Sequence, residues 1–175
     1  MRGVSGSEPR TLVVLRHAKS AWPDGVPDLR RPLGPRGLRD APVAGQWLAA
    51  RGLVPGAVVC SPSLRTRQTF ELAAAAWEAV PPVVFDERIY AADAEELVEV
   101  VRGLDPAVGT ALLVGHQPGV QDLVELLAAG TGGDAMDRLQ TKFPTSAIAV
   151  LDLAGPWRST APNTARLRDF TVPRG

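Results

Sequence analysis

The chain has 175 residues, of which 45% are hydrophobic and 22% are charged, a composition typical of one ordinary globular domain. Lys and Arg together number 19, as do Asp and Glu, so the formal net charge is zero. A chain without a basic excess has no electrostatic support for binding a nucleic-acid backbone or an anionic membrane surface. We therefore expect neither nucleic acid nor a membrane as a partner.

The single cysteine, Cys60, excludes an internal disulfide, and no apolar run is long enough to span a bilayer. Residues 1–10 are polar and lack the apolar core of a secretory signal. They are predicted to form a disordered leader before a single domain over residues 11–175. These features predict a cytoplasmic protein. No pattern specifies the oligomeric state, and a monomer is the default expectation.

Short apolar runs rich in β-formers alternate along the chain with segments of helical periodicity. The first run, residues 11–15, is followed by a Pro- and Gly-rich loop over about 22–37. The other predicted strands are 57–60, 83–85, 110–114 and 146–153, with a half-exposed edge strand at 164–172. Helices are expected at 38–51, about 61–77, about 94–103 and from 117 onward. This alternation predicts a three-layer α/β/α sandwich with a largely parallel sheet.

Capping residues mark where several of these helices begin. Ser61-Pro62 is typical of an N-cap followed by a first-turn proline, and Asp93 is a predicted N-cap for the helix after it. The helix over 38–51 contains Pro42. It either begins near an Asp40 cap or bends at the proline.

Residues able to carry chemistry follow three of the predicted strands. Arg16-His17 follows the first strand, Arg65 lies shortly after the second, and His116 follows the fourth. Ligands of open α/β sheets bind outside the carboxyl ends of the strands. Because the chain has two histidines and both occupy such positions, the sequence predicts a common site. A shared structural role for the two histidines is the alternative.

The chemistry of this set suits phosphoryl transfer. Arginine presents a planar fork of donors that matches phosphate oxygens, and Arg16 and Arg65 would supply two forks. Arg65 also lies in the first turn of a predicted helix, where free backbone N–H groups favour an anion. A neutral imidazole can attack phosphorus and form a covalent intermediate.

The same segments resemble the histidine phosphatase superfamily, which includes the cofactor-dependent phosphoglycerate mutases. Three motifs follow in order at strand ends and are similar to those of the family: residues 15–18 (Leu-Arg-His-Ala), 61–69 (Ser-Pro-Ser-Leu-Arg-Thr-Arg-Gln-Thr) and 115–116 (Gly-His). Residues 31–37 and 145–148 resemble the small SixA-like branch, the phosphohistidine phosphatases. The resemblance spans about residues 11–153.

This resemblance implies a phosphoglycerate mutase-like fold and a phosphatase with His17 as nucleophile. Arg16, Arg65 and His116 would bind the phosphoryl group, and no cofactor is implied. The expected substrate is a phosphohistidine of a protein, because a compact, uncovered site admits a protein side chain. The alternatives are a small-molecule phosphomonoesterase or mutase, for which the span from Arg65 to His116 leaves little room for enclosing insertions, and a catalytically silent phosphate-binding module.

The general acid is left open by the sequence. Residues 86–90 resemble the stretch that holds the acid glutamate in mutase-like members, which makes Glu87 the candidate. The alternative is a solvated loop carboxylate paired with Arg88. Asp24 and Asp28 are weaker candidates in the loop after His17. Many SixA-like members carry an aspartate where this chain has Arg30, which weakens any assignment of the substrate.

Other reactive residues are assigned structural or surface roles. Cys60 ends an apolar strand and is predicted to be a buried thiol, and no His/Cys cluster has the spacing of a metal site. Lys19 is a loop charge that would be able to reach a phosphate, and Arg67 is expected to face solvent or a carboxylate. The tryptophans are predicted to be packing residues: Trp22, Trp47, Trp77 and Trp157.

Overall fold

The computed structural model describes residues 9–175, so residues 1–8 of the predicted leader lie outside the described residues. Strands and helices alternate along the described chain. The strands are β1 (Arg10–Arg16), β2 (Ala57–Cys60), β3 (Val83–Phe85), β4 (Thr110–Gly115), β5 (Ile148–Leu153) and β6 (Ala165–Thr171). The helices are α1 (Pro35–Ala50), α2 (Leu64–Ala74), α3 (Ala94–Arg102), α4 (Gly119–Ala128) and α5 (Asp134–Thr141).

The six strands form one mixed sheet in the order β3-β2-β4-β1-β5-β6. The neighbours β3, β2, β4 and β1 are parallel to one another, whereas β5 is antiparallel to both β1 and β6. The prediction of a largely parallel sheet is confirmed, and β6 is the edge strand that its alternating sequence indicated. Over residues 9–175, no helix is long and apolar enough to cross a membrane.

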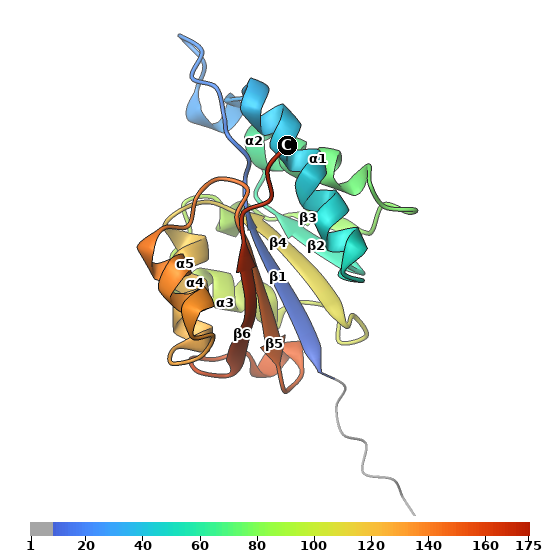
Figure 1. The fold of residues 1–175 in the computed structure, drawn as a ribbon, viewed down its shortest axis with the longest axis vertical. Coiled ribbons are helices and arrows are strands. Elements are labelled where there is room, and N and C mark those ends of the chain that lie inside the picture. The colour runs from blue at the N-terminus through green and yellow to red at the C-terminus, as the bar shows by residue number, and fades with distance from the viewer. Residues whose placement is uncertain (1–8) are drawn as a thin grey trace, which may run out of the picture.

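Helices cover both faces of the sheet, which confirms the three-layer prediction (Figure 1). Helices α1 and α2 pack on one face, and α3, α4 and α5 pack on the other. Strand β1 shows how a continuous apolar run serves both layers. Val13 and Leu15 pack toward α1 and α2, while Leu12 and Val14 pack into the opposite cluster, and all four are fully buried. The central strands therefore hold the site at their carboxyl ends on a rigid base.

Helix α1 begins earlier than the sequence predicted. It begins at Pro35 rather than residue 38, and it continues through Pro42. Asp40 is not its cap: the carboxylate lies inside the helix, is 1% exposed, and accepts hydrogen bonds from the Gly175 backbone N–H and the Arg174 guanidinium. A proline at the first helical position, which needs no hydrogen-bonded N–H, accounts for the earlier start.

Two further differences concern helices near the site. Helix α2 is capped by Ser63, whose hydroxyl accepts from the Thr66 N–H, so the prediction of Ser61 as the cap was wrong. Helix α5 was not predicted at all. Its N-cap residue, Gly133, has a φ of +49°. The two glycines before the helix favoured the prediction of a loop, and the apolar face formed by Met136 and Leu139 is short.

Candidate active site

The four residues predicted to share a site lie around one cavity of about 160 Å³. Arg16 ends β1 and His17 follows it, Arg65 is the second residue of α2, and His116 follows β4. Strands β1 and β4 are parallel neighbours with Arg16 opposite Gly115, so the two histidines emerge side by side. Figure 1 shows the segment between β1 and α1 projecting from the same end of the molecule.

The surroundings of His17 fix which ring nitrogen is free to react. Its backbone N–H donates to the Gly115 carbonyl, and the ring is 7% exposed. The ring atom Nδ1 lies 2.7 Å from the Ala18 carbonyl oxygen. Because a carbonyl only accepts, Nδ1 carries the proton and Nε2 keeps its lone pair in the neutral ring. The backbone N–H of Ala18 donates to the Thr69 hydroxyl of α2, which anchors this turn.

Burial, with smaller contributions from the charges of His116, Arg65 and Arg16, lowers the pKa of His17 to about 3, although the hydrogen bond to Ala18 opposes the shift. The imidazole is therefore neutral at pH 7 in the unliganded protein. A neutral ring with a free Nε2 is the form that can attack phosphorus.

His116 is held by complementary contacts. Its Nε2 lies 2.7 Å from the Ser61 hydroxyl, and its Nδ1 lies 3.4 Å from an Arg65 guanidinium nitrogen. Since Arg65 only donates, Nδ1 accepts and Nε2 donates to Ser61. Burial and then Arg65 lower the pKa of His116 to about 4. Ser61, predicted to be a helix cap, is thus the residue that orients the second histidine.

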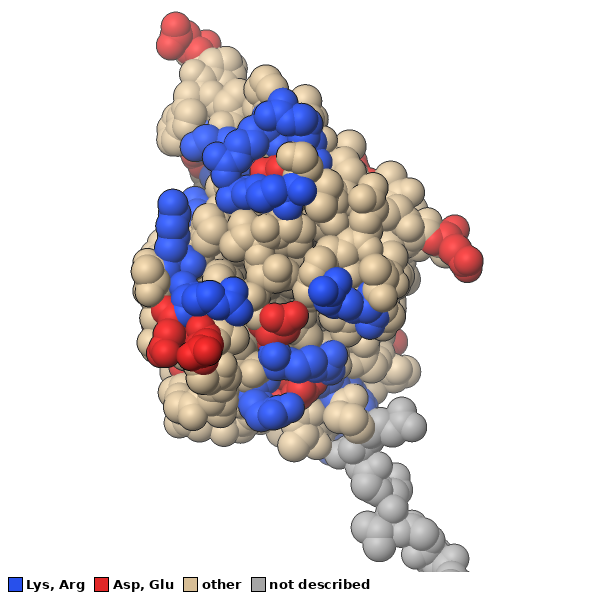
Figure 2. All heavy atoms as spheres, in the orientation of Figure 1, with Lys and Arg blue, Asp and Glu red and all other residues tan. Residues whose placement is uncertain are grey.

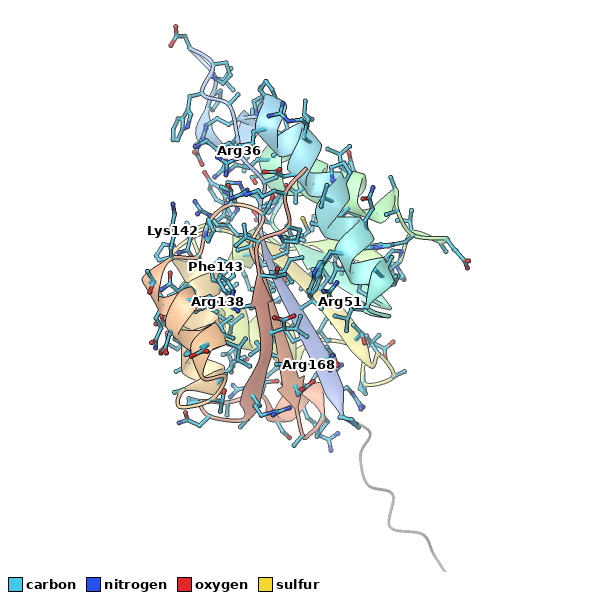
Figure 3. The ribbon with its side chains drawn as sticks, in the orientation of Figure 1. Arg36, Arg51, Arg138, Lys142, Phe143 and Arg168 are labelled. Atoms are coloured by element: carbon cyan, nitrogen blue, oxygen red, sulfur yellow. The ribbon has the colours of Figure 1, made fainter. Side chains whose placement is uncertain are left out.

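Arg16 brings a positive charge under the two rings. One of its guanidinium nitrogens donates to the Phe143 carbonyl at 2.9 Å. Phe143 follows α5, and Figure 3 shows it on the side of the sheet that α5 covers. Within residues 9–175, the buried Nε atoms of Arg16 and Arg65 have no hydrogen-bond partner. Buried donors without partners are costly, and an anion in the cavity would relieve that cost.

Asp28 accepts hydrogen bonds from Arg65. The two guanidinium nitrogens of Arg65 donate to the Asp28 carbonyl at 2.8 Å and to its carboxylate at 3.1 Å. Arg31 donates to the same carboxylate, as does the Tyr90 hydroxyl. The Tyr90 hydrogen bond, followed by Arg31 and Arg65, lowers the pKa of Asp28 well below its ordinary range. Asp28 is therefore ionised at pH 7 and has no proton to donate to a leaving group.

Glu87 is not brought into the cavity. It is exposed at the start of a 3-10 helix (Glu87–Ile89), and it is absent from the described residues that line the cavity. Its expected alternative partner, Arg88, instead forms an ion pair with Asp86 at 2.7 Å. Residues 86–90, the stretch that made Glu87 the candidate acid, instead contribute Tyr90, whose hydroxyl donates a hydrogen bond to Asp28 beside the cavity.

The other residues singled out in the sequence have mixed outcomes. Cys60 is fully buried, and burial raises the pKa of its thiol to about 12, as expected of an inert thiol. Arg67 was expected to face solvent or a carboxylate. It is half-buried, donates to the Pro62 carbonyl and lies over the Phe85 ring. Lys19 lines the cavity. Trp77 and Trp157 are core residues, but Trp22 is 73% exposed, so its assignment as a packing residue was wrong.

Basic side chains gather on one face at this end of the molecule (Figure 2). Figure 2 shows Lys and Arg gathered on the upper part of one face, where α1 begins and the chain ends. Arg36 and Arg174 lie there and share the buried Asp40 carboxylate at 3.5 and 2.8 Å. A cationic approach of this kind attracts phosphorylated groups.

Stability is expected to fall in mild acid because of the two histidines. Their pKa values in the folded chain, about 3 for His17 and about 4 for His116, lie below the ordinary 6.5. Below pH 6.5 the unfolded chain therefore binds protons that the folded chain excludes, and stability present above that pH is lost as pH falls toward 4. We expect the free energy of unfolding to drop on the order of 5 kcal/mol between pH 7 and pH 4.5, measured by urea denaturation.

The matched variant for this measurement is His116→Gln, which keeps a neutral donor near Ser61. It should show about half of the wild-type drop, since one of two titrating rings is gone. Asp28 acts at lower pH, because its pKa is depressed from 3.8, and so it does not contribute in this window. An unfolding free energy that stays constant from pH 7 to pH 4.5 would contradict the neutral, buried state of both rings.

Comparisons with known proteins identify the family and the fold of the chain. The model of the histidine phosphatase superfamily (branch 1) matches residues 12–102. An uncharacterized protein of Mycobacterium tuberculosis is 45% identical over 162 residues, which cover 91% of this chain and 100% of that protein. The structure of a Nakamurella multipartitia protein named as a SixA phosphohistidine phosphatase is similar with a TM-score of 0.83 and 32% identity, over 96% of this chain and 98% of that one.

Two other SixA structures show the same fold. The Agrobacterium tumefaciens protein has a TM-score of 0.80 and 30% identity, over 95% of this chain and 100% of that one. The protein histidine phosphatase SixA complexed with tungstate has a TM-score of 0.78 over 93% of this chain and 97% of that one, and at 24% identity it shows the shared fold alone. The chain belongs to branch 1 of the histidine phosphatase superfamily.

Proposed function

We propose that this protein is a phosphatase that transfers a phosphoryl group from its substrate to Nε2 of His17 and then to water. The observation that carries the proposal is the state of His17: a neutral, buried ring whose Nδ1 is bound to the Ala18 carbonyl and whose Nε2 is unprotonated. Arg16, Arg65 and His116 line the same cavity and supply the positive charge and donors that the transferring group needs.

The reaction has two steps that balance. In the first, the Nε2 lone pair forms a bond to phosphorus while the bond from phosphorus to the leaving group breaks. In the second, water attacks the phosphorus of phospho-His17, the P–N bond breaks, and inorganic phosphate and the free imidazole are released. Splitting the hydrolysis in this way replaces one difficult step by two easier ones.

Arg65 has two roles in this scheme. In the unliganded protein two of its guanidinium nitrogens donate to Asp28. A phosphoryl group in the cavity is a stronger, doubly charged acceptor and would compete for those donors, with the free Nε adding a third. The bound anion would also raise the pKa of His116, because a nearby negative charge favours the protonated ring, and Nδ1 would then donate to the phosphate.

A protein phosphohistidine is the proposed substrate. None of the described residues that line the cavity is a carboxylic acid, and Asp28 beside it is ionised. A phosphohistidine suits such a site, because its protonated imidazole leaves as a neutral molecule without a general acid. An alkyl phosphate would need a proton donor, and the exposed Glu87 would have to reach the site. These features favour a phosphohistidine over a small phosphomonoester or a mutase reaction.

Trapping the intermediate tests the proposed function. The protein is incubated briefly with a radiolabelled phosphodonor such as phosphoramidate, quenched in alkali, digested and mapped. We expect acid-labile, alkali-stable label on the peptide that contains His17. The variant Cys60→Ala serves as the control and should keep the label, because the buried thiol has no part in the transfer. Label on Cys60 or His116, or turnover with no trapped label, would contradict the mechanism.

A further inference from the structure

An exposed aromatic side chain lies at the rim of the cavity. Trp22 is 73% exposed, yet it lines the same cavity as His17 and Arg65. An indole that stays in water and still borders a reactive site contributes nothing to the core, so packing does not account for its position.

Trp22 is held in place by a cation. The guanidinium carbon of Arg31 lies 3.1 Å from the centre of the indole ring. Arg31 is itself 7% exposed and is fixed by the Ser20 hydroxyl, the Ala21 carbonyl and the Asp28 carboxylate. Since one face of the indole is covered by this immobilised guanidinium, the ring is preorganised and presents its other surface to whatever approaches the cavity.

Two further exposed apolar side chains lie in the segment that holds Trp22. Val26 and Leu29 follow Trp22 in the same projecting segment and are 36% and 44% exposed (Figure 1). We call Trp22, which lines the cavity, and the exposed Val26 and Leu29 of its segment the apolar rim. Asp24 is an exposed charge within this segment, and Arg30 and Lys19 are exposed cations beside it. Apolar groups with a polar border, next to a reactive site, mark a surface that meets another molecule.

The size of the cavity indicates what kind of molecule that is. At about 160 Å³ it holds a phosphoryl group and little more, whereas sites that enclose a whole small molecule have volumes of about 300–1,000 Å³. The remainder of a substrate must therefore lie outside the cavity and over its rim. A free phosphorylated metabolite has little surface with which to cover the apolar rim, but a protein has enough.

We propose that Trp22 is a specificity-determining residue, which contacts the apolar surface around the phosphohistidine of a protein substrate and so favours proteins over free phosphorylated molecules. This inference rests on the proposed phosphohistidine phosphatase function. Tryptophan supplies large, rigid contact area and is enriched among the residues that dominate protein interfaces.

The experiment compares two substrates that share one reacting group, a folded protein carrying phosphohistidine and free phosphohistidine. Trp22→Ala is expected to lower kcat/KM on the protein by about 10- to 100-fold through KM, and to change kcat/KM on free phosphohistidine less than about threefold. Trp22→Phe should recover part of the loss, because it restores an aromatic face over Arg31.

Trp47→Ala is the matched control. Trp47 is also stacked with an arginine, since the Arg51 guanidinium carbon lies 4.0 Å from its ring centre. Figure 3 shows Arg51 at the opposite end of α1 from Arg36, away from the cavity. Circular dichroism verifies that each variant is folded. Trp47→Ala should not change kcat/KM on one substrate more than on the other. Equal losses on both substrates for Trp22→Ala, or no loss on the protein, would overturn the proposal.

A binding measurement separates this proposal from the proposed function. In the background of His17→Ala, which blocks transfer, the phosphorylated protein should bind about 10- to 100-fold more weakly when Trp22→Ala is added. If the wild type hydrolyses neither substrate, the phosphatase proposal fails, and this affinity still decides the role of Trp22. Unchanged affinity would overturn that role.

Discussion

Replacement of His17 by alanine is expected to lower turnover by roughly 10⁴-fold or more, because it removes the atom that receives the phosphoryl group. The loss should appear in kcat for every substrate, including free phosphohistidine, because the intermediate is common to all of them. The measurement is phosphate release under saturating substrate, together with the trapping assay. The variant should form no labelled enzyme.

Binding should survive this change. Arg16, Arg65 and His116 remain in place, so His17→Ala should still bind an oxyanion such as tungstate or phosphate, measurable by calorimetry. Retained binding with lost turnover distinguishes the loss of a nucleophile from the collapse of the cavity. Turnover by His17→Ala within tenfold of the wild type would exclude the covalent mechanism and leave a direct attack by water as the explanation.

Replacement of Arg65 by alanine is expected to reduce kcat/KM by roughly 10³-fold. The variant loses donors to the transferring group, and the Asp28 carboxylate loses one of its two cationic partners, Arg65 at 3.1 Å. With Arg31 and Tyr90 as its remaining partners, the Asp28 charge is less neutralised and repels the incoming phosphate more strongly. Arg65→Lys should recover only part of the loss, because an ammonium cannot reproduce the planar fork.

A double variant separates the two effects. If repulsion by Asp28 contributes, Arg65→Ala combined with Asp28→Asn should recover part of the activity that Arg65→Ala loses, and non-additivity measures the coupling. Arg67→Ala is the control on the same helix, because its guanidinium packs over Phe85 rather than toward the cavity, and its kcat/KM should stay within a few-fold of the wild type. An Arg65→Ala variant with near-normal kcat/KM would remove Arg65 from phosphate binding.

Much of the architecture follows from local sequence. Runs such as Leu12 to Leu15 are apolar throughout because a central parallel strand is buried on both faces, and this requirement makes such strands recognisable. The helix starts were less predictable. The segment 61–63 offers more than one residue that could begin a helix. Ser63 caps α2, whereas the Ser61 hydroxyl contacts His116, and no local pattern records that contact.

The sequence by itself determined that His17, Arg65 and His116 follow parallel strands, because a strand end is a local feature and parallel strands end on one side of a sheet. The tertiary structure alone decided what surrounds them. Asp28 pairs with Arg65 across 37 positions, Ser61 with His116 across 55, and Tyr90 with Asp28 across 62. These hydrogen bonds join side chains of separate loops, and they, with burial, set the proton positions of His116 and the pKa value of Asp28.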